Sequence, residues 1–182
     1  MEVLELPDSA AWESWLTEHH EDHSEAWLRI AKRHSGLTSV TITEAFDVAL
    51  CFGWIDGQRK SLDDDSYLQR YSRRRPRSSW SQVNVGKVEV LLADGRMQSS
   101  GLAEVAAAKA DGRWDAAYEP QRTAEVPADL AAALAANATA NTAFERLGRS
   151  DRYQVILSLI KARTPETRGR ALARAIERLA GG

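Results

Sequence analysis

The spacing of apolar residues changes near residue 80 of this chain. Before that point helical and alternating segments follow one another, and after it only the helical spacing recurs. Residues 10–21 carry large side chains at i, i+3, i+4 and i+7, which predicts an amphipathic helix with Ser9 as its N-cap. Residues 25–33 predict a short strand, in which Trp27 would point to one face and Leu28 and Ile30 to the other.

Residues 41–73 predict a helix followed by a hairpin. Thr41 and Glu44 have the spacing of a capping box, and the helix that they begin should end at Gly53. Residues 54–61 and 66–73 predict two strands joined by the acidic turn at residues 63–65. Aspartates favour such a turn because their side chains bond their own backbone. Their spacing lacks the glycine and glutamate of a calcium loop, so we predict no metal site there.

Helices account for the rest of the chain. Ser81 is the expected cap of the first, and Ala-Asp-Gly-Arg segments ending at residues 96 and 113 should end two helices. Residues 115–126 are irregular and should link two parts. Further helices are expected to begin near Pro127, at Ser150 and at Thr164, and the final helix should bury Leu172, Ala175, Ile176 and Leu179.

The predicted fold class is therefore α+β: a small antiparallel sheet with packed helices, followed by an all-helical C-terminal part. We place the first part at residues 1–118 and the second at residues 119–182. A chain of 182 residues, 43% of them hydrophobic, is long enough to bury a core. No window approaches the roughly 20 apolar residues of a membrane-spanning helix, so no membrane insertion is expected. The single cysteine, Cys51, and an acidic N-terminus without an apolar signal core favour the cytoplasm.

Charge is distributed unevenly although the formal net charge is only −2. Residues 1–28 carry eight acidic side chains and no lysine or arginine, whereas residues 70–77 carry five arginines. The arginines could form an anion-binding surface, but ion pairs or a solvated surface explain them more simply. Interleaved aromatics would suit single-stranded nucleic acid, but the predicted pI near 6.1 makes nucleic acid an unlikely main partner.

Two tryptophan motifs mark the candidate binding site. Trp54 lies in Gly-Trp-Ile-Asp-Gly and Trp80 in Ser-Ser-Trp-Ser-Gln-Val-Asn, where neither helical nor strand patterning requires such residues. We expect both to be buried and close together. The candidate ligand-binding residues are Trp54, Asp56, Arg74, Arg77, Ser78, Trp80, Ser81 and Asn84. Asp56 is expected to pair with an arginine, and a structural pair is favoured over a catalytic role.

The sequence carries no complete catalytic or metal-binding pattern. The chain lacks a Gly-x-Ser-x-Gly elbow, a phosphate loop and a Rossmann fingerprint. His19 and His23 share a helix face, but without a clear third ligand we favour a cluster at a helix end over a metal site. No metal, cofactor or catalytic residue is therefore assigned.

The quoted motifs carry a family resemblance. The chain resembles the YdeI/OmpD-associated family, also called bacteriocin-protection proteins. The matching segments are residues 50–57, 74–84, 95–97, 126–130, 143–144 and 165–170. The family usually has proline where Arg73 stands and arginine where Ala171 stands. The resemblance implies protection from antimicrobial peptides and association with a porin, and it carries over no catalytic residue.

The favoured function is a non-enzymatic cytoplasmic protein of stress resistance or bacteriocin protection, with a cleft for a ligand or partner. The ligand could be a small anion or a protein. One alternative is an enzyme that acts on a small anionic substrate through Asp56 and the arginines. The other is a nucleic-acid-binding protein.

Overall fold

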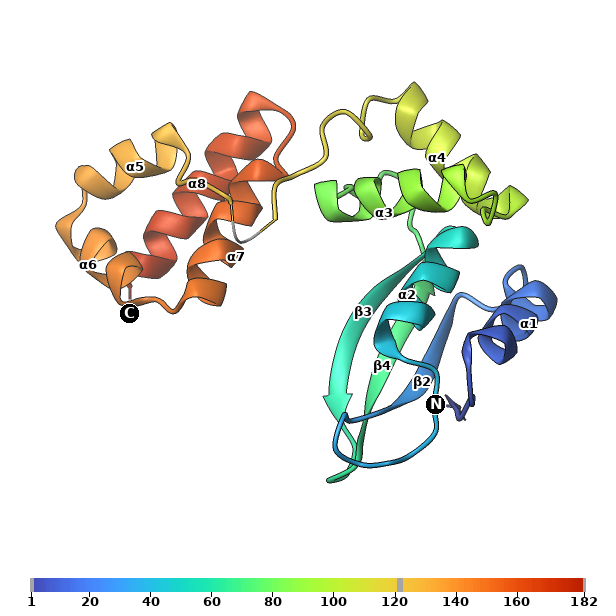
Figure 1. Ribbon diagram of the computed structural model, residues 1–182. Coiled ribbons are helices and arrows are strands. Elements are labelled where there is room, and N and C mark those ends of the chain that lie inside the picture. The colour runs from blue at the N-terminus through green and yellow to red at the C-terminus, as the bar shows by residue number, and fades with distance from the viewer. Residues whose placement is uncertain (1, 121–122, 182) are drawn as a thin grey trace. The chain divides into compact units, whose positions relative to one another are not determined.

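The computed structural model describes residues 2–120 and 123–181 of the chain (Figure 1). Over these residues the chain divides into two compact units. One contains residues up to 78 and residues 84–116, and the other contains residues 79–83 and those from 117 onward. Each unit is described by itself below, as the N-terminal unit and the C-terminal unit.

A four-stranded sheet forms the centre of the N-terminal unit. Its strands are β1 (Val3–Leu4), β2 (Glu25–Ala31), β3 (Trp54–Ser61) and β4 (Ser66–Arg73), in the order β1-β2-β4-β3. β2, β4 and β3 pair antiparallel, as expected, but β1 adds a parallel strand that the sequence prediction missed. The sheet is therefore mixed. Two residues are too few to show an alternating pattern, which explains the omission.

Helices α1 (Ser9–His19) and α2 (Ile42–Cys51) pack beside the sheet, and both contact Tyr71 of β4. The ring centroids of Trp12 and Tyr71 are 5.8 Å apart, and the Tyr71 hydroxyl donates to the Ile42 carbonyl at 3.5 Å. The Trp12 indole N–H donates to the Ala45 carbonyl, which joins the two helices. Trp12 and Tyr71 are fully buried, so this contact is the centre of the core.

Two more helices complete the N-terminal unit: α3 (Gln82–Ala93), whose first two residues belong to the other unit, and α4 (Ser99–Ala110). α4 lies against the end of α2 because its second residue after Ser99 is Gly101. A Cβ on that glycine would lie 2.1 Å from the Cys51 carbonyl oxygen, so only glycine fits. The Gln98 N–H, at the N-cap of α4, donates to the same carbonyl.

The C-terminal unit contains α5 (Ala128–Ala135), α6 (Ala138–Arg146), α7 (Arg149–Ile160) and α8 (Pro165–Ala180). Their buried side chains form one core, which includes Leu130, Phe144, Ile156 and Leu159. The inward face predicted for the last helix is confirmed: Ala175 and Leu179 are buried, and Leu172 and Ile176 pack against the core. Within the described residues no helix has both the length and the apolar character to cross a membrane.

Helix starts were predicted with mixed success. Thr41 forms the expected capping box with Glu44, and Thr164 caps α8 with Pro165 in its first turn. The predicted cap Ser9 is wrong, since the Asp8 carboxylate accepts the Ala11 N–H and begins α1. The predicted cap Ser150 is also wrong, because α7 begins two residues after Leu147 with Gly148 as its N-cap. α3 begins directly after Ser81, as expected, and Pro127 is the N-cap of α5 rather than part of its first turn.

Candidate functional site

Trp54 lies at the start of β3, fully buried among other aromatic rings. Its ring centroid is 6.3 Å from that of Trp12 and 6.2 Å from that of Trp15, both in edge-to-face geometry. Such contacts fix the ring more firmly than burial alone. The Trp54 indole N–H is enclosed and has no hydrogen-bond acceptor among the described residues. The expected burial of Trp54 is therefore confirmed, and one polar atom is left unsatisfied.

A hollow of about 430 Å³ opens beside Trp54 within the N-terminal unit. Four segments of the chain form its walls: the end of α1, the α2–β3 turn, the end of β4, and α4. The lining residues are His20, Glu21, Phe52, Gly53, Trp54, Arg73, Ser100, Ala103 and Glu104. We call this the Trp54 hollow. It combines an aromatic wall with a few polar groups, as ligand-binding pockets commonly do.

The local sequence explains why the wall at the α2–β3 turn is tight. Gly53 ends α2 with φ of +75°, a backbone conformation that side chains with a Cβ rarely adopt. The turn then receives α4 closely, since the Ser100 hydroxyl donates to the Phe52 carbonyl at 3.0 Å. Glu104 of α4 packs over Gly53. The sequence prediction found Gly53 and Trp54 but missed the contribution of α4, which comes from nearly fifty residues further along the chain.

Asp56 lies two residues after Trp54 on β3, opposite Tyr71 of β4. The expected ion pair with an arginine is not formed: no arginine among the described residues bridges Asp56. Desolvation raises the pKa of the Asp56 carboxyl, and the positive charges of Arg74 and Arg59 only partly oppose this effect. Arg74 therefore acts on Asp56 through space without a direct ion pair.

The arginines of residues 70–77 are used largely within the fold. Arg70 binds the Glu25 carboxylate on the neighbouring strand, with Nε at 2.9 Å from Oε2. Arg73 donates to the carbonyls of His20 and Glu21 at the end of α1. Arg74 is buried, with 4% of its surface exposed. The simpler of the two sequence interpretations, a structural role, is thus confirmed for Arg70 and Arg73.

The remaining predicted residues follow β4. Arg77 is exposed in a turn with φ of +64°, and the Ser78 carbonyl accepts a hydrogen bond from Arg113 at 3.0 Å. Trp80 and Ser81 are buried and belong to the C-terminal unit, where the Tyr118 N–H donates to the Trp80 carbonyl. Asn84 belongs to the N-terminal unit. Because Trp54 and Trp80 belong to different units, their proximity stays a prediction.

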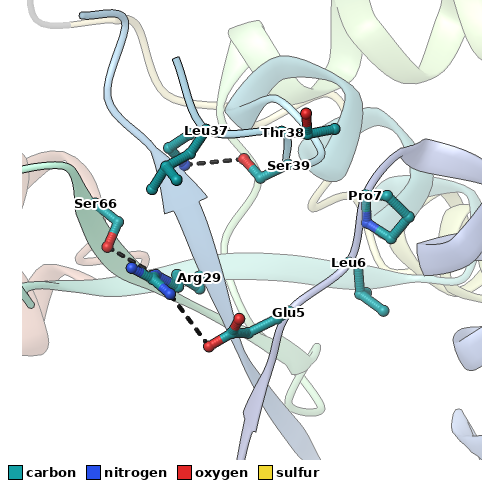
Figure 2. Close-up of a pocket in the computed structure, with 9 residues that line it drawn as sticks. Glu5, Leu6, Pro7, Arg29, Leu37, Thr38, Ser39 and Ser66 are labelled. Atoms are coloured by element: carbon teal, nitrogen blue, oxygen red, sulfur yellow. Dashed lines mark hydrogen bonds and ion pairs between the residues drawn. The ribbon is translucent and has the colours of Figure 1, made fainter. Parts of the chain in front are cut away.

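A second hollow, of about 240 Å³, surrounds Arg29 on β2 (Figure 2). Arg29 donates to the Ser66 hydroxyl at 2.9 Å and pairs with Glu5 at 3.3 Å and Asp63 at 3.0 Å. The Asp63 carboxylate also accepts N–H groups of the β3–β4 turn, and its pKa is lowered chiefly by the Ser66 hydroxyl. Two nitrogens of the guanidinium therefore tie β2 to the β3–β4 hairpin, and the third ties it to the segment after β1. The only feature of the sequence that could have indicated this hollow is a single arginine between Leu28 and Ile30 of a predicted strand.

A larger hollow, of about 770 Å³, shares Ala31, Leu37 and Ser39 with the Arg29 hollow. It lies along the loop between β2 and α2, and its charged residues are Lys32 and Arg33. The Lys32 ammonium donates to the Asp63 carbonyl at 2.8 Å. Of its lining residues only Ile30 is buried, whereas Phe52, Gly53 and Trp54 are buried in the lining of the Trp54 hollow, which makes this hollow the weaker candidate.

The histidines at the end of α1 surround an aromatic ring. The ring centroids of His19 and His23 lie 4.9 Å and 5.2 Å from that of Trp15. In the part of the chain that the structure describes, no group of three or more His, Cys, Asp or Glu side chains is arranged to hold a metal ion.

Comparisons with known proteins divide the chain in two. Residues 4–104 match a family described as a domain of unknown function (DUF8412). Residues 123–182 match the family described as bacteriocin-protection, YdeI or OmpD-associated, which confirms the family predicted from the motifs for this part of the chain. No curated protein and no solved structure matches. The Trp54 hollow falls within the first match, between residues 20 and 104.

Proposed function

The chain belongs to the DUF8412 family and ends in a bacteriocin-protection part, and from this we propose that it is a non-enzymatic protection protein. It raises resistance to bacteriocins or related stress by holding a ligand, or a segment of a partner protein, in the Trp54 hollow. A cytoplasmic location is part of the proposal. It is supported by Cys51, a buried cysteine and the single one in the sequence, because a chain with one cysteine cannot form an internal disulfide of the kind common in exported proteins.

The observation that carries this proposal is the Trp54 hollow itself. It is lined by a rigidly packed indole and by side chains from separate elements, so its shape is set by the fold rather than by one flexible loop. Preformed hollows bind with little loss of conformational entropy.

The test is to fill the hollow and measure protection. Ala103 is exposed on α4 and lines the hollow, so Ala103→Trp should occupy it. Ala106→Trp adds the same side chain about one turn along the same helix, outside the lining, and serves as the matched control. Both variants and the wild type are expressed in a bacteriocin-sensitive bacterial strain, and survival is scored over a range of bacteriocin concentrations.

We expect Ala103→Trp to lose protection and Ala106→Trp to keep it. Circular dichroism and thermal unfolding of the purified proteins establish that both variants are folded. Equal protection by the wild type and a folded Ala103→Trp variant would show that protection does not depend on the Trp54 hollow.

A further inference from the structure

Glu104 is the charged group of the Trp54 hollow that the fold leaves unpaired. It lies on α4, half-buried, with its Cγ 2.9 Å from the position that a Cβ on Gly53 would take. Among the described residues it forms neither a hydrogen bond nor an ion pair. Its carboxylate is therefore available to pair with a cation that enters the hollow.

Arg73, the cation that lines the same hollow, is already used by the fold. Its Nη2 atom donates to the carbonyls of His20 at 2.5 Å and Glu21 at 2.6 Å, at the C-terminal end of α1. The partial negative charge of a helix end attracts such a guanidinium. Arg73 therefore compensates the end of α1, and it makes no ion pair with Glu104 among the described residues.

The surroundings of the hollow carry further negative charge. The Glu21 side chain, which also lines it, is 85% exposed, and its nearest ionisable partner is His20 at 3.9 Å. Glu18, near the end of α1, is also exposed. Exposed carboxylates of this kind attract cations.

The aromatic wall supplies a second kind of recognition. Trp54 is fully buried, lines the hollow, and has an indole N–H without an acceptor among the described residues. Phe52 lies beside it. The methylene groups of a lysine or arginine can pack on apolar surface while the charged end reaches a carboxylate.

We propose that the Trp54 hollow takes a lysine or arginine side chain of a basic peptide segment, with Glu104 as its ion-pair partner. This inference rests on the proposed function, because it names the class of ligand for the same hollow. It differs from the anionic ligand suggested by the arginine-rich sequence, since Arg70 and Arg73 are used within the fold.

The test is calorimetric titration of the full chain with tetralysine whose two ends are blocked, at low salt. Tetraglutamate with blocked ends is the comparison ligand. Glu104→Gln keeps the size of the side chain and removes its charge. Glu18→Gln removes a carboxylate from α1 that does not line the hollow, and so controls for the general acidic field.

We expect tetralysine to bind the wild type and tetraglutamate not to bind. Glu104→Gln should weaken tetralysine binding by about tenfold, and Glu18→Gln by no more than about twofold. Thermal unfolding checks the fold, and Glu104→Gln should be at least as stable as the wild type because the carboxylate it removes is unpaired. Ala103→Trp should abolish binding.

Two results would overturn the inference: equal binding of tetralysine by wild type and Glu104→Gln, or no binding of tetralysine at all. The survival assay distinguishes failure of the proposed function from failure of this inference about the ligand. If Ala103→Trp loses protection while tetralysine does not bind, the hollow is functional and its ligand is not basic. If a folded Ala103→Trp variant still protects, the proposed function itself is wrong, whether or not tetralysine binds.

Discussion

Arg168 and Asp129 form a two-point ion pair that joins α8 to α5. The Arg168 Nε lies 2.6 Å from Asp129 Oδ2, and its Nη2 lies 2.9 Å from Oδ1. Nη1 also donates to the Leu159 carbonyl at 3.1 Å, near the end of α7. One guanidinium thus links three helices of the C-terminal unit, and planar paired donors of this kind are available to arginine but not to lysine.

Replacing this arginine should lower stability by more than an ordinary surface pair would. Both side chains are about 35% exposed, so solvent screens part of the interaction. We expect Arg168→Lys to cost about 1 kcal/mol in the free energy of unfolding, because the ammonium cannot make the paired contact. Urea unfolding measures it. Arg170→Lys, at an exposed pair with Glu166, is the control and should change little.

The same pair predicts a dependence of stability on pH. The hydrogen bonds from Arg168 hold the pKa of Asp129 below its ordinary value. A carboxyl with a lowered pKa in the folded state adds stability above its unfolded pKa, and the contribution is lost as pH falls through the folded pKa. The stability difference between wild type and Asp129→Asn should therefore be constant near neutral pH and shrink below about pH 4. A difference that persists at pH 2 would contradict this assignment.

Trp54→Ala should destabilise the N-terminal unit strongly. The side chain is fully buried and its loss would leave a cavity beside Trp12 and Trp15. Aromatic-to-alanine changes in cores cost about 3–5 kcal/mol. Trp54→Phe is the control, since it retains most of the apolar contact. A melting temperature for Trp54→Ala within a degree or so of wild type would show that the ring is not part of the core.

Two glycines on neighbouring helices should respond oppositely to alanine. At Gly101 the added methyl group would lie 2.1 Å from the Cys51 carbonyl oxygen, so Gly101→Ala must push α4 away from α2 and destabilise the unit. At Gly86 in α3 nothing lies within 4 Å of the same methyl group. Gly86→Ala should therefore raise stability by about 0.5–1 kcal/mol, the usual gain in helix propensity. Chemical denaturation of both variants compares them directly.

Removing residues 164–182 should expose the core of the C-terminal unit. The last helix contributes Ala175 and Leu179 to that core and the Arg168 side chain to the ion pair with Asp129. The shortened protein should bind a hydrophobic dye more strongly and aggregate at lower temperature, because most helix stability comes from packing of the apolar face. A shortened protein that stays monomeric and equally stable would show that the helix is dispensable.

Local features of the fold were predictable because their cause lies within a few residues. Thr41 and Glu44 satisfy each other's backbone groups three positions apart, and Asp63 bonds the N–H groups of its own turn. Errors arose where neighbouring residues compete for the same role. Asp8 and Ser9 are both good N-caps, and Asp8 is the cap because its backbone is extended and its carboxylate accepts the Ala11 N–H.

The sequence by itself determined the α+β class, the hairpin, the helical C-terminal part and the identity of Trp54 as a buried anchor, since periodicity and turn chemistry act over short separations. Tertiary structure alone decided which charges meet. Arg70 binds Glu25, 45 residues away, rather than Asp56. The strand register places Arg70 and Glu25 on one face of the sheet, and Asp56, opposite Tyr71, on the other face. It also decided that Gly101 would bring α4 against Cys51 and leave Glu104 unpaired beside Trp54. Such contacts depend on packing between distant segments, and no local pattern specifies them.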